Sequence, residues 1–160
     1  MRLTLAAIGR LKAGPDRELF DRYWGRLDAA GRKVGVTGVK LVELAESRAA
    51  VAAERKADEA ARLLKAAGQG VLIVALDEGG KSLSSVAFAQ FIGRHRDDGC
   101  AEMALMIGGP DGHGADVLAR AQLVLGLGAM TLPHGLARIV IAEQLYRAMT
   151  ILSGHPYHRV

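Results

Sequence analysis

The sequence predicts a single α/β domain in which a mostly parallel β-sheet is covered by helices on both faces. Residues 71–76 (VLIVAL) and 101–107 (AEMALMI) are largely apolar runs of strand length, and glycines lie close to both ends of each run. Such runs are typical of strands that are buried on both faces. Helix-length segments separate the predicted strands, and this alternation favours a parallel sheet. The chain, residues 1–160, is long enough for one such domain with a substantial core.

The remaining strands and helices follow from local pattern. The other strands are expected at residues 3–8, 34–44 and 123–125, and the helices at residues 15–27, 47–67, 84–95, 115–121 and 136–152. Ser47 is the predicted cap of the second helix, and Gly68 is the residue expected just after its end. Ser84 or Ser82 is expected to begin the third helix. The second helix carries many charges and a thin apolar face, so we expect it to be mostly exposed.

The stretch 125–135 (LGLGAMTLPHG) organises the rest of the chain. It consists of a short apolar strand, a loop of small residues and, after Pro133, the start of the last helix. The first turns of that helix are apolar nearly all round, so the helix needs a partner on each face. The sheet supplies one partner. A second subunit is a natural supplier of the other, and a central core position within a monomer is the alternative.

Composition limits the class of protein. The net charge of +4 and the pI near 9.5 permit nucleic-acid binding without requiring it. Cys100 stands alone, so no intrachain disulfide can form and a metal site is not expected. Arg138, Glu143 and Arg147 in the last helix argue against a membrane span. The first apolar run is too short for a signal peptide core, so we expect a cytoplasmic protein.

The glycine-rich segments do not match the common nucleotide-binding motifs. Gly80 begins a Gly-Lys-Ser triplet after a buried strand, but Ala75 stands where a P-loop needs its first glycine. The segment 108–114 (GGPDGHG) lacks the GxGxxG spacing of a Rossmann site. Gly126 begins that spacing, but Thr131 occupies the third glycine position. The P-loop interpretation therefore fails, and a Rossmann site is weakly supported.

The position of these loops nevertheless points to a ligand. Leu76, Gly108 and Leu127 lie at or just beyond the C-terminal ends of three predicted strands, and open α/β sheets bind ligands at that edge. A loop of small and apolar residues can accept an adenosine through backbone groups. Residues 127–132 contain no arginine or lysine to meet a polyphosphate. We therefore expect an adenosyl sulfonium, S-adenosylmethionine, rather than a nucleoside triphosphate.

The C-terminal tail is the second candidate functional segment. His155, Pro156, Tyr157, His158 and Arg159 place two imidazoles, a phenol and a guanidinium around a stiff proline. Such groups stack on a splayed RNA base, bind its edges and hold its phosphate. A neutral histidine can also take a proton near pH 7. The alternative is a frayed, polar chain end.

Four motifs in order make the whole chain resemble the SPOUT methyltransferases known as the ribosomal RNA large subunit methyltransferase H family: IGGPDG, LGAMTLPHGLAR, EQLYRAMTI and HPYHR. The resemblance implies a parallel-sheet SPOUT fold with a deep C-terminal trefoil knot, and a homodimer without metal or membrane attachment. It implies S-adenosylmethionine as methyl donor and, as acceptor, N3 of a pseudouridine in the helix 69 loop of 23S rRNA within assembled ribosomes. Position by position, the implied donor contacts are Leu76, Gly108, Leu127, Gly128, Ala129, Met130, Thr131 and Leu132.

The same resemblance places the tail in the active site. Within it we assign His158 as the proton acceptor, Tyr157 as a stacking and orienting group, and Arg159 as a phosphate or carbonyl contact. Arg10 and the His113-Gly114 pair depart from the usual family pattern without undermining the activity. Two alternatives stay open: a non-catalytic ribosome- or RNA-binding protein with the same fold, and a SPOUT methyltransferase that acts on tRNA.

Overall fold

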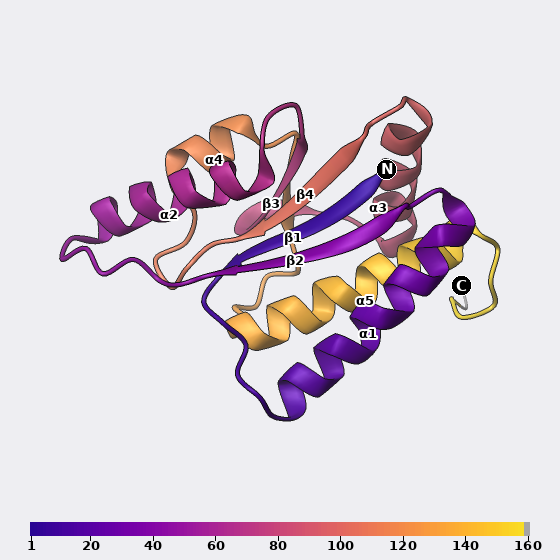
Figure 1. Ribbon diagram of the computed structural model, residues 1–160, viewed down its shortest axis with the longest axis horizontal. Coiled ribbons are helices and arrows are strands. Elements are labelled where there is room, and N and C mark those ends of the chain that lie inside the picture. Colours follow the sequence, from indigo (N-terminus) through magenta and orange to yellow (C-terminus); the bar gives the residue numbers. More distant parts are fainter. Residues whose placement is uncertain (159–160) are drawn as a thin grey trace.

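The computed structural model describes residues 1–158. Its centre is a five-stranded parallel sheet with the strand order β2-β1-β4-β3-β5 (Figure 1). The strands are β1 (Arg2–Ile8), β2 (Gly38–Leu44), β3 (Leu72–Ser82), β4 (Glu102–Ile107) and β5 (Leu123–Gly126). The parallel sheet expected from the apolar runs is confirmed.

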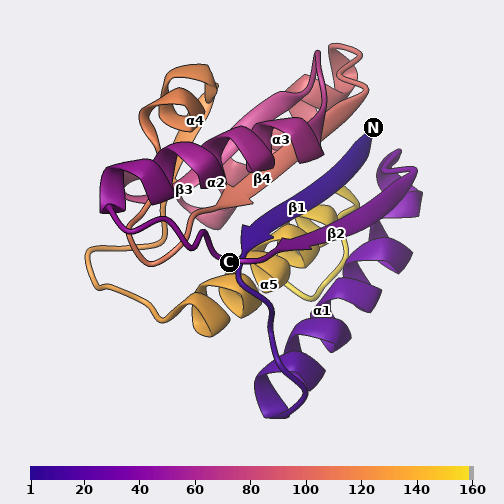
Figure 2. The same ribbon diagram turned by 60° about the vertical axis from the view of Figure 1, so that its left-hand side comes forward.

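Helices cover both faces of the sheet (Figures 1 and 2). They are α1 (Pro15–Gly31), α2 (Ala52–Ala67), α3 (Ser85–Asp97), α4 (Ala115–Arg120) and α5 (His134–Leu152), with a short 3₁₀-helix, η1, at Arg32–Val34. α1, α3 and α5 pack on one face, and α2 and α4 pack on the other. Along β1, Leu3 and Leu5 face the first layer while Ala6 and Ile8 face the second, so the strand is apolar on both sides.

α5 is the central helix of the larger layer. It packs against both α1 and α3, and Ile139, Ile141, Leu145 and Met149 are almost fully buried. Helices of the same chain therefore cover most of α5, and its apolar character alone does not require a second subunit. The homodimer and the trefoil knot stay predictions. Between residues 1 and 158, no helix combines the length and apolar character needed to cross a membrane.

A buried ion pair fixes the start of α5 to the sheet. Arg138 is 3% exposed, and its Nη1 donates to Glu43 Oε1 on β2 at 2.8 Å. Its Nη2 donates to the carbonyl oxygens of Ile8 at 2.8 Å and Gly9 at 2.7 Å. Burial lowers the pKa of Arg138, and the nearby Glu43 carboxylate opposes that shift. The first turns of α5 are thus held at the C-terminal ends of β1 and β2.

α2 begins later than the sequence predicts. The helix starts at Ala52, so the prediction of Ser47 as its cap is wrong. The Ser47 amide instead donates to Glu59 Oε1 at 2.8 Å, and residues 47–51 form an irregular segment before the helix. At the other end Gly68 has φ +88° and follows the last helical residue, as predicted.

β2 is shorter and β3 longer than predicted. Gly35 is in the left-handed region, with φ +81°, and separates η1 from β2, which begins only at Gly38. β3 continues to Ser82 because its second half pairs with β5 across a register shift between Leu76 and Lys81. The predicted cap Ser84 is confirmed for α3, since its Oγ accepts from the third residue after it.

β3 and β5 approach most closely at two glycines. A Cβ on Gly80 would lie 2.6 Å from Gly126 N and 2.6 Å from the carbonyl carbon of Leu125. A Cβ on Gly126 would lie 2.9 Å from the carbonyl oxygen of Gly80. Real Cβ atoms do not come this close, so the two backbones touch only because neither residue has a side chain. The loops that leave β3 and β5 are thereby brought to the same edge of the sheet.

Gly80→Ala is expected to lower the free energy of unfolding by about 1–3 kcal/mol, because the new methyl group must displace backbone atoms. Urea denaturation measures the change. Gly25→Ala in α1 is the matched control, since a Cβ there meets nothing within 4 Å and alanine favours the helix by about 1 kcal/mol. Wild-type stability of Gly80→Ala would contradict the close approach of the two strands.

Candidate functional site

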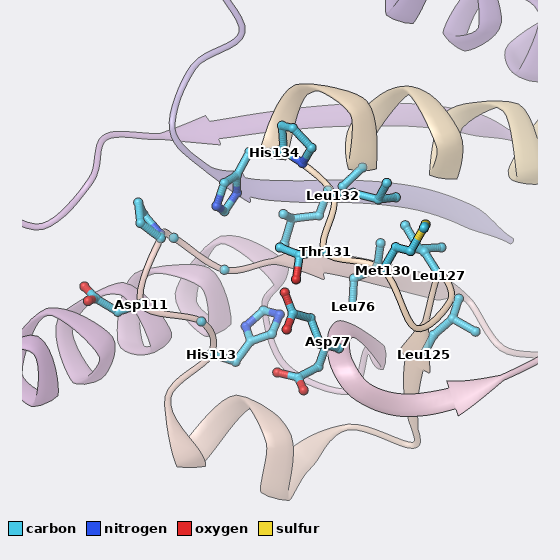
Figure 3. Close-up of a pocket in the computed structure, with 18 of the residues that line it drawn as sticks. Leu76, Asp77, Asp111, His113, Leu125, Leu127, Met130, Thr131, Leu132 and His134 are labelled. Atoms are coloured by element: carbon cyan, nitrogen blue, oxygen red, sulfur yellow. The ribbon is translucent and has the colours of Figure 1, made fainter.

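A cavity of about 670 Å³ lies at the C-terminal edge of the sheet, beyond β4 and β5 and beside residues 76–78 in the middle of β3 (Figure 3). This is the edge at which the sequence predicts a ligand. The predicted donor contacts that line it are Leu76, Gly108, Leu127, Gly128, Met130, Thr131 and Leu132. The remaining one, Ala129, belongs to the same loop but is not a lining residue. The volume falls within the range of small-molecule sites.

One wall of the cavity is the glycine turn, residues 108–112, which follows β4. Gly112 N donates to Gly109 O at 2.9 Å, and the φ of +84° at Gly112 is a left-handed conformation that favours glycine. A Cβ on Gly108 would lie 2.9 Å from the carbonyl carbon of Gly112. The turn favours glycine at these two positions, so backbone groups contribute to this wall beside Pro110 and Asp111.

Helix α2, which packs on the sheet face opposite α5, contacts the glycine turn through two side chains. Arg55 Nε and Nη2 donate to the two carboxylate oxygens of Asp111 at 2.7 and 3.1 Å, and this contact lowers the pKa of Asp111. Glu59 is 3% exposed, and a Cβ on Gly109 would come within 2.5 Å of its Oε2. The turn is therefore tied to a helix that lines no part of the cavity.

His113 is a cavity residue that the sequence analysis did not assign to the site. Its ring points from the end of the glycine turn toward Asp77 (Figure 3). His113 Nε2 lies 3.1 Å from the carbonyl oxygen of Met106, so the neutral ring carries its proton on Nε2. Nδ1 is buried and has no partner within residues 1–158. Burial lowers the pKa of His113, although the Met106 carbonyl and the Asp77 carboxylate act in the opposite direction.

The charges along the cavity are acidic. Asp77 and Glu78 line it directly after the buried half of β3, and Asp77 Oδ1 accepts from Gly79 N at 2.9 Å. No lysine or arginine occurs among the described residues that line the cavity. Such a lining favours a cationic ligand over a polyphosphate. Neither Asp77 nor Glu78 is among the predicted site residues, although their place directly after a buried apolar run is a signal that the sequence carries.

The described tail residues do not reach the cavity of their own chain. α5 has 19 residues and is about 28 Å long. His134 and Ala137 at its start line the cavity, whereas the tail follows its last turn (Figure 1) and folds back onto Glu143. Tyr157 and His158 are half-buried there, and the Tyr157 hydroxyl donates to Glu143 Oε1 at 3.0 Å. Arg159 lies outside the described residues. Up to residue 158, no group of three or more histidine, cysteine or acidic side chains could hold a metal ion.

The chain is similar to known proteins over its full length. A family model described as "Predicted SPOUT methyltransferase" matches residues 1–158. Proteins called ribosomal RNA large subunit methyltransferase H from Brucella anthropi and Rhizobium meliloti are 54% and 56% identical over 159 residues, which cover 99% of this chain and 99% of each relative. The protein of the same name from Rhizobium leguminosarum bv. trifolii is 52% identical over 160 residues, 100% of both chains.

Replacing His113 by leucine is expected to flatten the loss of stability in acid. Burial lowers the pKa of His113 in the folded state, so the unfolded chain, in which histidine titrates near pH 6.5, binds more protons. Stability is therefore fully present above about pH 6.5 and falls as the pH drops toward the lower folded pKa. Melting temperatures of both proteins between about pH 8 and pH 5 test this expectation. An equally steep decline in His113→Leu would contradict it.

Proposed function

The chain belongs to the SPOUT methyltransferase family, and from that premise we propose that it methylates N3 of pseudouridine 1915, in helix 69 of 23S rRNA, with S-adenosylmethionine as donor. It is a methyltransferase, and the name shared by its relatives makes large-subunit ribosomal RNA the substrate class. The proposed acceptor is the nucleotide within assembled ribosomes. The net charge of +4 accords with a small enzyme for which the ribosome provides much of the recognition surface.

The observation that carries this proposal is the cavity at the C-terminal edge of the sheet. Its walls are backbone of the glycine turn and the small or apolar side chains of residues 127–132, which suit a flat adenosine. Asp77 and Glu78 provide negative charge for a donor with a positive sulfonium. When bound, the donor supplies an electrophilic methyl group on that sulfonium.

The residues proposed to hold the donor come from the middle of β3 and from the loops that follow β4 and β5. Leu76 follows the buried half of β3, and Gly108 begins the glycine turn after β4. The loop after β5 supplies the remaining positions that line the cavity: Leu127, Gly128, Met130, Thr131 and Leu132. We also assign Ala129 to the donor site through its backbone, because its neighbours Gly128 and Met130 both line the cavity. These groups fix the orientation of the donor, and transfer to a nitrogen gains most from such alignment.

The acceptor nitrogen must lose a proton around the transition state. We propose that His158 accepts this proton. Arg159 is assigned as a phosphate or carbonyl contact and Tyr157 as an orienting group. Tyr157 lies on Glu143, about 14 Å along α5 from His134 at the cavity, and neither Tyr157 nor His158 lines the cavity of its own chain, so we propose that the tail at each cavity comes from a second copy. A two-fold homodimer that sets each tail beside the partner's cavity would meet this requirement.

Calorimetric titration of the purified protein tests the donor. We expect saturable binding of S-adenosylmethionine and none of GTP or NADH, because the cavity lining lacks cationic side chains for a phosphate. Incubation with ribosomes that lack the modification, followed by mass spectrometry of the rRNA nucleosides, then identifies the acceptor. Donor binding without methylation of pseudouridine would refute the proposed substrate while leaving the donor site intact.

Mixing two inactive variants tests the assignment of His158 and the use of the partner's tail. His158→Ala should abolish turnover with donor binding unchanged, and Thr131→Arg should abolish donor binding, because it adds a bulky cation to the cavity rim. Random pairing after mixing leaves about a quarter of all sites with an intact cavity and an intact tail, so about a quarter of wild-type activity should return. No recovery, with mixed dimers present, would mean that each tail serves its own chain.

A further inference from the structure

The second half of α5 carries a side-chain cluster that the proposed mechanism does not use. It consists of Glu143, Tyr146 and Arg147, and we refer to these three residues as the tail dock. Tyr157 of the tail lies on this cluster, because the chain turns back after α5 (Figure 1). The cluster is separate from the cavity, which none of the three residues lines.

Glu143 is the centre of the tail dock. Its Oε1 accepts from the Tyr157 hydroxyl at 3.0 Å and from Arg147 Nε and Nη2 at 3.0 and 2.6 Å. Its Oε2 accepts from Gln144 Nε2 at 2.7 Å, and Gln144 Oε1 in turn accepts from Ser85 Oγ on α3 at 2.6 Å. The carboxylate is therefore held in one orientation by α5 and α3 before the tail reaches it.

The ring of Tyr157 is enclosed as well as its hydroxyl. The ring centroid lies 4.6 Å from that of Tyr146, and the Arg147 guanidinium lies 5.1 Å from it. A ring in these contacts must leave them before it can stack on an RNA base. Burial and the hydrogen bond to Glu143 raise the pKa of Tyr157 to about 12, so the phenol stays a donor throughout the neutral range.

The backbone between α5 and Tyr157 is also fixed. Gly154 has φ +67°, and its amide donates to the carbonyl of Ile151 at 3.2 Å. The His155 amide donates to the carbonyl of Thr150 at 2.9 Å, and the Tyr157 amide donates to His155 Nδ1 at 3.2 Å. The path of the tail is thus determined up to the residue directly before His158.

We propose that Tyr157 is an anchor and Glu143 a positioning residue, which together hold the tail so that His158 is presented to the acceptor base. The inference rests on the proposed function, since it assigns a role to residues that act through the proposed proton acceptor. His158 is covalently next to the anchored residue, so loss of the anchor frees it to sample many orientations. Proton transfer depends on alignment, and turnover should fall while donor binding is unaffected.

The test is a double-mutant cycle on methylation of ribosomes. Tyr157→Phe keeps the ring and removes the hydroxyl, and Glu143→Gln keeps the shape and removes the charge. Each should lower kcat about tenfold, the effect of one hydrogen bond to a charged group, with the KM for S-adenosylmethionine unchanged. The double variant should be no slower than the slower single variant, because both changes break the same contact.

A matched control and a direct measurement of docking accompany the cycle. Asp58→Asn in α2 removes an exposed i,i+4 pair with Arg62, comparable to the Glu143–Arg147 pair but on the other face of the sheet, and should retain wild-type kcat. Hydrogen exchange of the amides of His155 and Tyr157 reports tail order without reference to activity. It should accelerate in Tyr157→Phe and Glu143→Gln and stay unchanged in Asp58→Asn.

The outcomes separate the two proposals. A wild-type kcat for Tyr157→Phe, or losses that add in the double variant, would overturn the anchor role and indicate that the two residues act independently. Unchanged hydrogen exchange of the tail in both single variants would overturn it as well. A wild-type protein that binds the donor but does not methylate ribosomes would instead overturn the proposed function, and the positioning role with it.

Discussion

The geometry of the site depends on the buried ion pair between Arg138 and Glu43. Glu43 also accepts from Leu11 N at 2.9 Å and from Arg17 Nη1 at 3.2 Å, so one carboxylate joins β2, the loop after β1, α1 and α5. Removing one partner of a buried pair typically costs about 3–5 kcal/mol, because a charge is left without compensation. The loop 127–133 joins β5 to α5, so the ion pair fixes the position of the helix at which this loop ends.

Because α5 is long and buried, it keeps two sets of proposed functional residues apart: those of the cavity and those of the tail dock. Its first residues border the cavity, and its second half carries the tail dock, which begins about 14 Å further along the helix. A helix packed against α1, α3 and the sheet does not bend to close that distance. The proposal that the two sets meet between two copies of the chain rests on this separation and not on the apolar character of α5.

The sequence predicts the parts of this structure that rest on local pattern. Buried parallel strands follow from continuous apolar runs, and the cavity follows from the loops at their C-terminal ends. Contacts between distant residues account for the rest. Ser47 does not cap α2 because Glu59, within the helix, binds its amide. The extension of β3 to Ser82 is polar and depends on pairing with β5. His113 lines the cavity only because the glycine turn directs it there, and Tyr157 is anchored by a carboxylate fourteen positions earlier in the chain.

The fastening of the glycine turn by α2 has a consequence for how this sequence can diverge. A Cβ on Gly109 would lie 2.5 Å from Glu59 Oε2, so a side chain there requires the Glu59 carboxylate to move. Asp111 is similarly matched to Arg55. The residues that are tolerated at positions 55 and 59, on a helix that lines no part of the cavity, therefore depend on the residues at positions 109 and 111. Related chains should change these positions in concert, so that an exchange tolerated in one lineage is harmful when transplanted alone into another.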